Sequence, residues 1–311
     1  MSRVRHPHLP LRNGVSASCV AVPAGGWPTV LDFLAERLPV LSRADWLARL
    51  NQGHVLDTQG QPVPAHAPCS SGQRLFYYRG WPDEPPTPED ATILFQDDWL
   101  VVVDKPHFMP VTPSGRFVQR SLLVQLKRRL GLPHLSPLHR IDRETAGLVV
   151  LAVQPNTRAA YQALFRDRQV GKLYEAVAPY LPALALPHTH CSRLEADAER
   201  FFISREVPGP PNSETHIEHA AMLAGGQHAL YHLRPVTGQR HQLRLHMAAL
   251  GAPILGDSFY PRVLRPAQAP DDLLHPLQLL ARHLSFTDPV TGQKRQFESV
   301  RSLAAIQDQD G

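Results

Sequence analysis

The sequence predicts an α+β protein with two domains, and three observations lead to this expectation. The 311 residues are 43% hydrophobic and 19% charged, which suffices for a packed core and is too apolar for a disordered chain. A helical hydrophobic pattern near the N-terminus is followed by residues 81–90, whose four prolines and four acidic residues predict an extended linker. From residue 91 onward, strand patterns outnumber helical ones.

Composition also argues against several protein classes. The three cysteines, Cys19, Cys69 and Cys191, are odd in number and widely spaced, so we expect no disulfide scaffold and a cytoplasmic, reducing location. The apolar run of the best strand candidate, Leu148–Val153, is far shorter than the roughly 20 residues that cross a membrane. The N-terminus has no continuous apolar stretch, so we expect no signal peptide.

The first domain is expected at residues 28–80, with two helices followed by two strands. Ser42 suits the N-cap of the second helix and Gly53 its C-terminal end. His54–Asp57 and Arg74–Tyr78 have strand composition. This order resembles the S4 RNA-binding module, and a generic small α+β domain is the alternative.

The second domain is expected at residues 91–300, after the linker. An irregular arm is expected before the first domain, at residues 1–27, and a C-terminal tail after the second, at residues 301–311. The hydrophobic periods of the second domain predict alternating strands and helices. The expected strands include Ala91–Phe95, Leu100–Val103, Gly147–Val153, Lys172–Ala178, several between Arg200 and Arg234, Leu284–Thr287 and Lys294–Phe297; the expected helices are Ser121–Leu130, one capped by Asn156 that runs to about Arg166, and His241–Leu250.

Positive charge is concentrated in one segment of the chain. Between Lys105 and Lys172 there are twelve Lys or Arg against three Asp or Glu, although the whole chain carries a net charge of only +4. A solvated helix face would account for three of these cations, at residues 127–129, but not for the others. The concentration therefore favours a polyanion-binding surface.

An acidic residue between two arginines is the most unusual motif. Asp142 lies between Arg140 and Arg143, directly before the predicted buried strand. Flanking cations favour an ionised carboxylate, which can act as a nucleophile or a base. A structural ion pair that holds the loop is the alternative, and the residues alone leave the two equally open.

Two further motifs carry candidate functional residues. Strand alternation places Lys172 and Tyr174 on one face, where the tyrosine can stack on a base; an ordinary core or edge aromatic is the alternative. Arg240 and Arg244 are four residues apart, so a helix would place both on one face, toward a carboxylate or phosphate; a surface arginine pair is the alternative.

One histidine-containing run resembles a metal-binding sequence. His188, His190 and Cys191 lie close together, but prolines bracket the run and no second ligand pair is evident. We therefore expect a loop without a metal.

The motifs VVVDKPHFMPV, HRIDRETAGL, KLYEAV and PVTGQRHQLRLHMAALGAPILGD resemble, in this order, those of the RluA-type pseudouridine synthases. The resemblance covers about residues 91–300. It implies the pseudouridine-synthase fold, an α+β architecture with a large, mainly antiparallel mixed sheet and a central cleft. It also implies isomerisation of uridine in RNA without a cofactor or metal. An S4-like N-terminal module is a frequent companion in this family.

The resemblance implies roles for individual residues. Asp142 would be the essential aspartate, Tyr174 the active-site tyrosine and Arg244 the basic partner of the aspartate. Arg140 matches the position from which some members insert an arginine into the space of the flipped base. Together with this residue, the expected RNA contacts are Arg143, Lys105, Lys172, Arg240 and His241.

Other functions remain open from the sequence. A non-catalytic RNA-binding protein would lack Asp142, Tyr174 or Arg244, and all three are present. A nucleoside or sugar hydrolase would need a second carboxylate, for which Glu144 and Glu175 are the near candidates, and Glu175 should point away from the Tyr174 face. The expected partner is ribosomal or transfer RNA, and the family default is a monomer.

Overall fold

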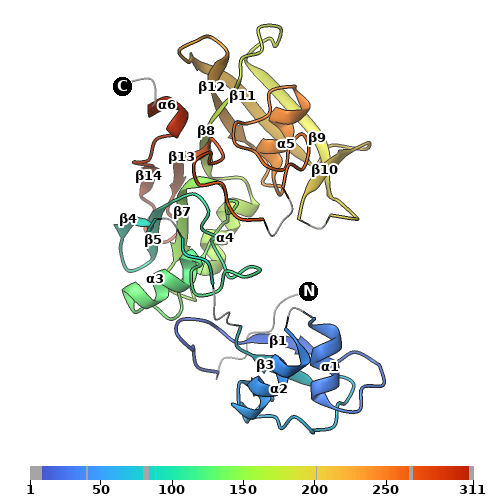
Figure 1. Ribbon diagram of the computed structural model, residues 1–311. Helices are drawn as coiled ribbons and strands as arrows, with labels where there is room; N and C mark the ends of the chain where they lie inside the picture. Colours follow the sequence, from blue (N-terminus) through green and yellow to red (C-terminus); the bar gives the residue numbers. More distant parts are fainter. Residues whose placement is uncertain are drawn as a thin grey trace. The chain divides into compact units, whose positions relative to one another are not determined.

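The computed structural model describes residues 9–39, 41–79, 84–87, 89–200, 202–265 and 269–307. The chain divides into two compact units (Figure 1). The first comprises Met1–Pro85, Ser114–Gln119 and Lys127–Pro133; the second comprises Pro86–Pro113, Arg120–Leu126 and His134–Gly311. The main division falls inside the predicted linker. Two short segments of the predicted second domain group with the first unit, and helix α3 (Leu122–Leu130) spans one of these divisions.

The first unit contains a three-stranded sheet, ordered β1-β3-β2, and two helices. Their bounds are β1 Ser18–Ala21, α1 Val30–Arg37, α2 Arg43–Asn51, β2 Val55–Leu56 and β3 Arg74–Tyr77. Both helices begin with a capping box, in which the N-cap side chain and an acidic residue satisfy each other's backbone N–H groups. Ser42 is the N-cap of α2, as predicted, and Gly53 follows that helix with a φ of +66°.

The prediction of an irregular arm over residues 1–27 is wrong for part of the described segment. Residues 18–21 form β1, which pairs antiparallel with β3, with Ser18 opposite Tyr77. Val22 is buried in the core of the first unit. A four-residue strand with alternating partial exposure is too short to give a clear period in the sequence.

The second unit is built on an eleven-stranded sheet with the order β10-β9-β11-β12-β8-β13-β7-β5-β4, to which β14 and β6 are attached. The β13–β7 pair is parallel and the other pairs are antiparallel, which confirms the predicted mainly antiparallel mixed sheet. The bounds are β4 Thr92–Gln96, β5 Leu100–Lys105, β6 Ser136–Pro137, β7 Ala146–Ala152, α4 Arg158–Arg166, β8 Gly171–Pro179, β9 His188–Ala196, β10 Ser204–Val207, β11 Ser213–Met222, β12 His228–Pro235, α5 Gln242–Ala249, β13 Leu279–Thr287, β14 Lys294–Glu298 and α6 Ala304–Gln307.

Three local predictions in this unit need correction. Helix α4 has Thr157 at its N-cap instead of Asn156, without a side-chain capping bond. The run His188–Cys191 is the first part of strand β9 and not a loop, since its polar side chains alternate along the strand. The chain beyond residue 300 also belongs to the second unit, because Leu303 is fully buried beside Val177 and Leu280.

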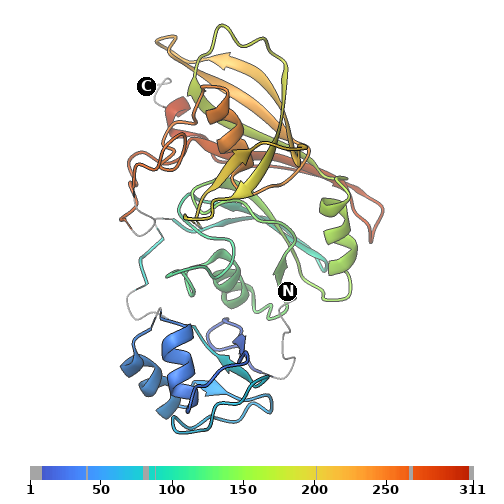
Figure 2. The same cartoon turned by 90° about the vertical axis from the view of Figure 1, so that its right-hand side faces the viewer.

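Figure 2 shows α4 (yellow-green) and α5 (orange) at different parts of the second unit's sheet. The two helices contribute side chains to separate apolar clusters. Leu243 and Met247 of α5 pack with Ala176 and Tyr231, whereas Tyr161 of α4 packs in the cluster that contains β7 side chains. This packing places α5 over β8, the strand that carries Tyr174. Among the described residues, we find no helix with the length and apolar character that a membrane crossing requires.

Candidate active site

The loop that carries Asp142 ends at a glycine whose conformation no other residue adopts easily. Gly147 has a φ of +109°, and a Cβ there would lie 2.4 Å from the carbonyl oxygen of Ala281. Ala281 is the parallel β13 partner of Gly147, so the two backbones approach closely. Thr145 N–H donates to the carbonyl of Asp142 at 3.2 Å. The HRIDRETAGL motif therefore forms a tight loop that enters β7 at a defined point.

Strand register brings Tyr174 to the same place. Ala281 is also the β13 partner of Tyr174, so Gly147, Ala281 and Tyr174 lie in line across three strands. Burial and the negative charge of Asp142 raise the pKa of the Tyr174 hydroxyl well above its usual value. The phenol is therefore neutral around pH 7 and can donate a proton or a hydrogen bond.

Arg244 approaches the site from helix α5 and is buried, with its side chain 1% exposed. Its Nε and Nη2 atoms donate to the two carboxylate oxygens of Asp257 at 2.8 and 2.7 Å. Asp257 is itself fixed, since it accepts backbone N–H groups from Phe259 and Tyr260. Burial opposes the charge on Arg244, but the hydrogen bonds and charge of Asp257 raise its pKa above the usual value. The guanidinium is thus a permanently charged, rigidly held group.

The third nitrogen of this guanidinium faces the predicted aspartate. Arg244 Nη1 lies 3.5 Å from Asp142 Oδ2 and 3.8 Å from Glu144 Oε2. It is buried and has no hydrogen-bond partner among the described residues. Asp142 is 25% exposed at its side chain, so it remains reachable for a ligand. An unused donor is therefore directed between two carboxylates, one of which is the predicted catalytic residue.

Lys105 was predicted to contact RNA, and the structure contradicts this. The residue is fully buried, and its Nζ donates to the carbonyl oxygens of Pro106 at 2.8 Å and Arg143 at 3.2 Å. Burial lowers the pKa of Lys105 to about 7. Next to it, His107 Nδ1 lies 2.6 Å from the carbonyl oxygen of Glu144. Lys105 at the end of β5 and the partly exposed His107 therefore hold the backbone of the Asp142 loop, and Lys105 does not reach solvent.

The other expected RNA contacts lie in different environments. Arg140 is exposed, and Lys172 is half-buried. Arg143 is engaged in a two-point ion pair with Asp271, with both distances 2.7 Å. The contact with RNA that was expected of Arg143 would therefore require this ion pair to open.

Arg240 and Arg244 do not share a helix face, contrary to prediction. Helix α5 begins at Gln242, and His241 before it adopts a left-handed conformation with a φ of +57°. Arg240 is therefore outside the helix and exposed, and it donates to the carbonyl of Phe202. His241 is buried between Asp142 and Tyr260. Its Nε2 lies 3.9 Å from Asp142 Oδ1, and its Nδ1 lies 2.8 Å from the Tyr260 hydroxyl.

Glu144 and Glu175, the candidates for a second catalytic carboxylate, lie in different environments. Glu175 forms an ion pair with Arg282 at 2.6 Å, whereas the alternate residue Tyr174 packs with the α5 cluster. The expectation that Glu175 points away from the Tyr174 face is therefore confirmed. Glu144 faces Arg244 beside Asp142, and it also accepts from Arg143 Nε at 3.1 Å.

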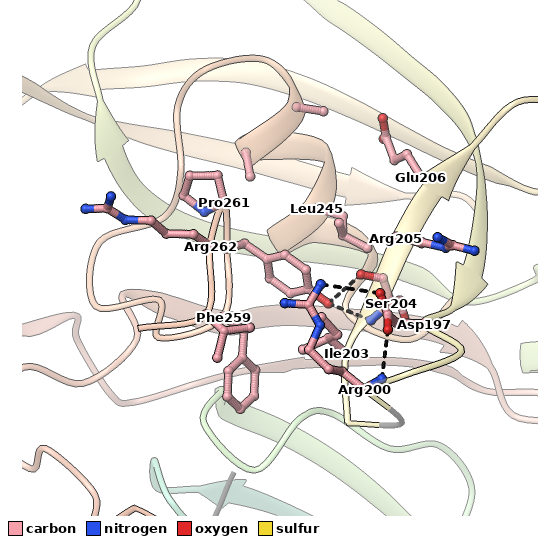
Figure 3. A pocket seen from close by; sticks show the side chains of 14 residues that line it. Asp197, Arg200, Ile203, Ser204, Arg205, Glu206, Leu245, Phe259, Pro261 and Arg262 are labelled. Carbon is pink, nitrogen blue, oxygen red and sulfur yellow. Dashed lines mark hydrogen bonds and ion pairs between the residues drawn. The ribbon is translucent and has the colours of Figure 1, made fainter. Parts of the chain in front are cut away.

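A pocket of about 290 Å³ lies close to Arg244, between β10, α5 and the loop that follows α5. Figure 3 shows Arg205 and Glu206 of β10 on one side of the pocket and Arg262 on the opposite side. Its wall includes Phe259 and Tyr260, over whose rings the Arg244 guanidinium lies at 5.1 and 5.4 Å.

Sequence reasoning missed the residues that hold the site in place, namely Asp257, His107 and Asp271. Asp257 is the last residue of the longest recognised motif, so a signal for it was present. Nothing near Asp271 in the sequence indicates its pairing with Arg143, because that contact depends on the fold.

Comparisons with known proteins agree on one family. Residues 99–249 match the family model described as RNA pseudouridylate synthase. The chain is 31% identical over 265 residues to an uncharacterised RNA pseudouridine synthase of Synechocystis, a match that covers 82% of this chain and 89% of that protein. It is 32% identical over 220 residues to the dual-specificity RNA pseudouridine synthase RluA of Escherichia coli, covering 69% and 95% of the two chains.

Solved structures with this fold point the same way. The human RNA pseudouridylate synthase domain containing 4 matches with a TM-score of 0.52 and 27% identity, over 68% of this chain and 88% of that one. The human RNA pseudouridylate synthase domain containing 1 matches with a TM-score of 0.56 and 22% identity, over 70% and 86%. The predicted fold class is therefore confirmed.

Proposed function

Since this chain belongs to the RluA-type RNA pseudouridine synthases, we propose that it isomerises uridine in RNA with Asp142 as the essential carboxylate. In this reaction the N1–C1′ glycosidic bond breaks, the uracil turns, and C5 bonds to C1′. The hydrogen on C5 leaves as a proton, and N1 gains one, so the product is an isomer of the substrate. No redox partner is needed for this balance.

The observation that carries the proposal is the placement of Arg244 Nη1, 3.5 Å from Asp142 Oδ2. Asp257 binds the Nε and Nη2 edge of the guanidinium, so the remaining nitrogen, Nη1, is left for the reacting carboxylate. The carboxylate then acts on the ribose, either by attack at C1′ or by removal of a ribose proton. In both paths Arg244 stabilises the charge on Asp142 whenever the carboxylate is free.

Tyr174 is proposed to stack on the uracil and to assist proton transfer. Its raised pKa keeps the hydroxyl protonated, so it is suited to donate and not to abstract a proton at neutral pH. Its position across from Gly147 places the ring beside the loop that carries Asp142.

RNA is proposed to be held by the exposed Arg140 and Arg240 and by the half-buried Lys172. Arg140, two residues before Asp142, is exposed and can fill the space that an extruded uridine leaves between its neighbouring bases. Lys172 and Arg240 are the further proposed phosphate contacts. For Lys105 the buried position leaves only the role of holding the loop.

The substrate is proposed to be ribosomal or transfer RNA, and the first unit is proposed to be an S4-like RNA-binding domain. One relative is named as dual-specific, which supports a choice among more than one RNA. The two-helix, three-strand order of the first unit supports an S4-like arrangement. The chain is also proposed to be a cytoplasmic monomer; its three cysteines are free, which is compatible with a reducing compartment.

Tritium release from RNA labelled at uracil C5 tests the proposal directly, because forming the C5–C1′ bond displaces that hydrogen. Total RNA from cells that lack this protein is the substrate, and wild type is compared with Asp142→Ala. Release by wild type alone supports both the activity and the role of Asp142. Equal release by a folded Asp142→Ala variant would show that another residue performs the chemistry.

A further inference from the structure

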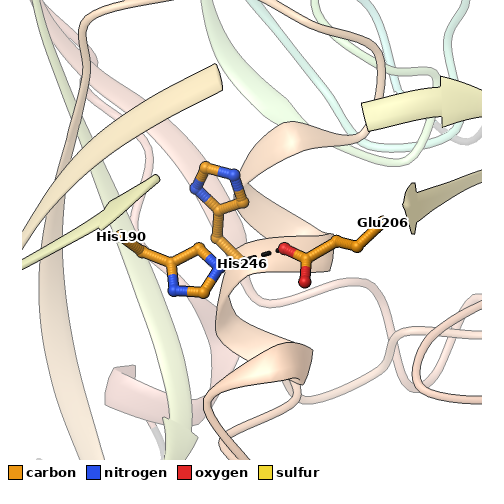
Figure 4. A group of neighbouring side chains, drawn as sticks. All are labelled: His190, Glu206 and His246. Atoms are coloured by element: carbon orange, nitrogen blue, oxygen red, sulfur yellow. Dashed lines mark hydrogen bonds and ion pairs between the residues drawn. The ribbon is translucent and has the colours of Figure 1, made fainter. Parts of the chain in front are cut away.

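A cluster of three side chains of metal-ligating types, separate from the Asp142 loop, joins two strands and helix α5. His190 from β9, Glu206 from β10 and His246 from α5 converge so that one ligand atom of each lies within 4.8 Å of the others (Figure 4). His190 Nε2 is 3.0 Å from Glu206 Oε1, and the two imidazole rings are 4.6 Å apart. Three separate elements therefore supply two imidazoles and one carboxylate to a single point.

The most buried member of the cluster is held as a ligating histidine would be. His246 is fully buried, and its Nδ1 lies 2.9 Å from Thr215 Oγ1, which can accept the Nδ1 proton. A histidine that binds a metal through one nitrogen commonly donates the other N–H to such a partner.

We propose that His190, Glu206 and His246 form a binding site for one Zn²⁺ ion. Zinc binds imidazole nitrogen and carboxylate oxygen at about 2 Å, so ligand atoms on one ion lie about 3–4 Å apart. The 3.0 Å separation of His190 Nε2 and Glu206 Oε1 already fits this spacing. The carboxylate is 31% exposed, and a small movement of this side chain closes the remaining distance to His246.

Two histidines with one carboxylate leave an open zinc position, which water fills. Glu206 also lines the 290 Å³ pocket, so this position lies near a surface that a ligand can reach. The ion would join β10, the outermost strand of the sheet order, to the helix that carries Arg244. Zinc binding would therefore stabilise the edge of the sheet next to the proposed active site.

A competing interpretation assigns His246 a purely structural role. Its Nε2 lies 2.9 Å from Ser213 Oγ and 3.2 Å from Ser192 Oγ, so hydroxyl groups can satisfy the ring without a metal. In that case His190 and Glu206 form only a surface pair. The two interpretations differ in what the protein does when zinc is added.

The test is a zinc titration of the full chain after removal of metals with a chelator, using a chromophoric zinc indicator as competitor. We expect one tight site per chain and an increase of the melting temperature with added zinc, because the ion binds only the folded state. Cobalt substitution adds a spectroscopic readout of nitrogen and oxygen coordination. These measurements do not depend on RNA or on the isomerase activity.

Variants at the more exposed ligands keep the test independent of folding. His190→Gln and Glu206→Gln should each weaken zinc binding by at least about tenfold, since even outer-shell changes at metal sites cost that much. The matched control is His216→Gln, because His216 also lies near a glutamate, Glu214, at 3.5 Å. Equal zinc affinity of wild type, His190→Gln and Glu206→Gln would overturn the proposal and leave only adventitious binding among the 17 histidines.

Discussion

Asp257 binds Arg244 through two hydrogen bonds of 2.8 and 2.7 Å and thereby directs the remaining nitrogen, Nη1, toward the proposed reaction centre. Both side chains are 1% exposed. The pair is therefore a charged element inside the core, whose geometry depends on both partners.

We predict that Asp257→Asn lowers both stability and turnover. Removing one charge of a buried ion pair costs about 3–5 kcal/mol, because the remaining cation is left uncompensated. A displaced guanidinium would also reduce the tritium-release rate, by at least about 10²-fold. Urea unfolding and single-turnover tritium release measure the two effects. Asp271→Asn, which breaks a more exposed pair with Arg143, is the control and should cost much less. Wild-type turnover in Asp257→Asn would refute the positioning role.

We predict that Glu144→Gln preserves activity and Asp142→Asn abolishes it. Both carboxylates face Arg244 Nη1, but Glu144 is farther away and already accepts from Arg143. The amide in Glu144→Gln keeps the shape and removes competition for Nη1, so the rate should stay within about threefold of wild type or rise. Asp142→Asn should lose at least about 10²-fold while its RNA affinity is retained. A large loss in Glu144→Gln would instead support a catalytic second carboxylate.

We predict that Arg140→Ala and Lys105→Met affect different steps. Arg140 is exposed, so its loss should weaken RNA binding. The slope of log K for RNA binding against log salt concentration should also become shallower, by about the amount that one phosphate contact contributes. Lys105 is buried, so Lys105→Met should leave the salt slope unchanged and lower turnover through loosening of the Asp142 loop. Filter binding across a salt series, combined with tritium release, separates the two. An unchanged slope in Arg140→Ala would remove this residue from the RNA-binding surface.

We predict that acid lowers stability through histidines that the fold keeps neutral, among them the half-buried His139. Burial lowers the pKa of His139 to about 3, and its Nε2 accepts the backbone N–H of Val150 at 3.1 Å, which requires the neutral ring. A folded-state pKa below the unfolded value means that the unfolded chain takes up the proton first. Stability is therefore intact above about pH 6.5 and is lost as the pH falls toward 3, by up to about 1.4 kcal/mol per pH unit for each such group.

The measurement is the urea unfolding free energy at pH 7 and pH 5, for wild type and His139→Gln. The glutamine does not titrate, so the difference between the two pH values should shrink by about 1–2 kcal/mol in the variant. His66→Gln serves as the control, since His66 is an exposed histidine of the first unit. The same pH dependence in His139→Gln as in wild type would contradict the assignment.

The sequence by itself predicted most strands of the second unit from their apolar periods, and the resemblance of its motifs to a known family implied the mixed sheet and singled out Asp142, Tyr174 and Arg244. Both signals can be read from short segments of the chain, because a period or a motif extends over only a few neighbouring residues.

Only the tertiary structure decided which charged side chains reach solvent. Lys105 and Arg244 are buried while Arg140 and Arg240 are exposed, although all four are cations in recognised motifs. Burial depends on the register of strands and on helix packing, which join residues far apart in the chain. For the same reason the sequence alone assigned His190 to a loop without a metal, whereas the fold brings Glu206 and His246 to it.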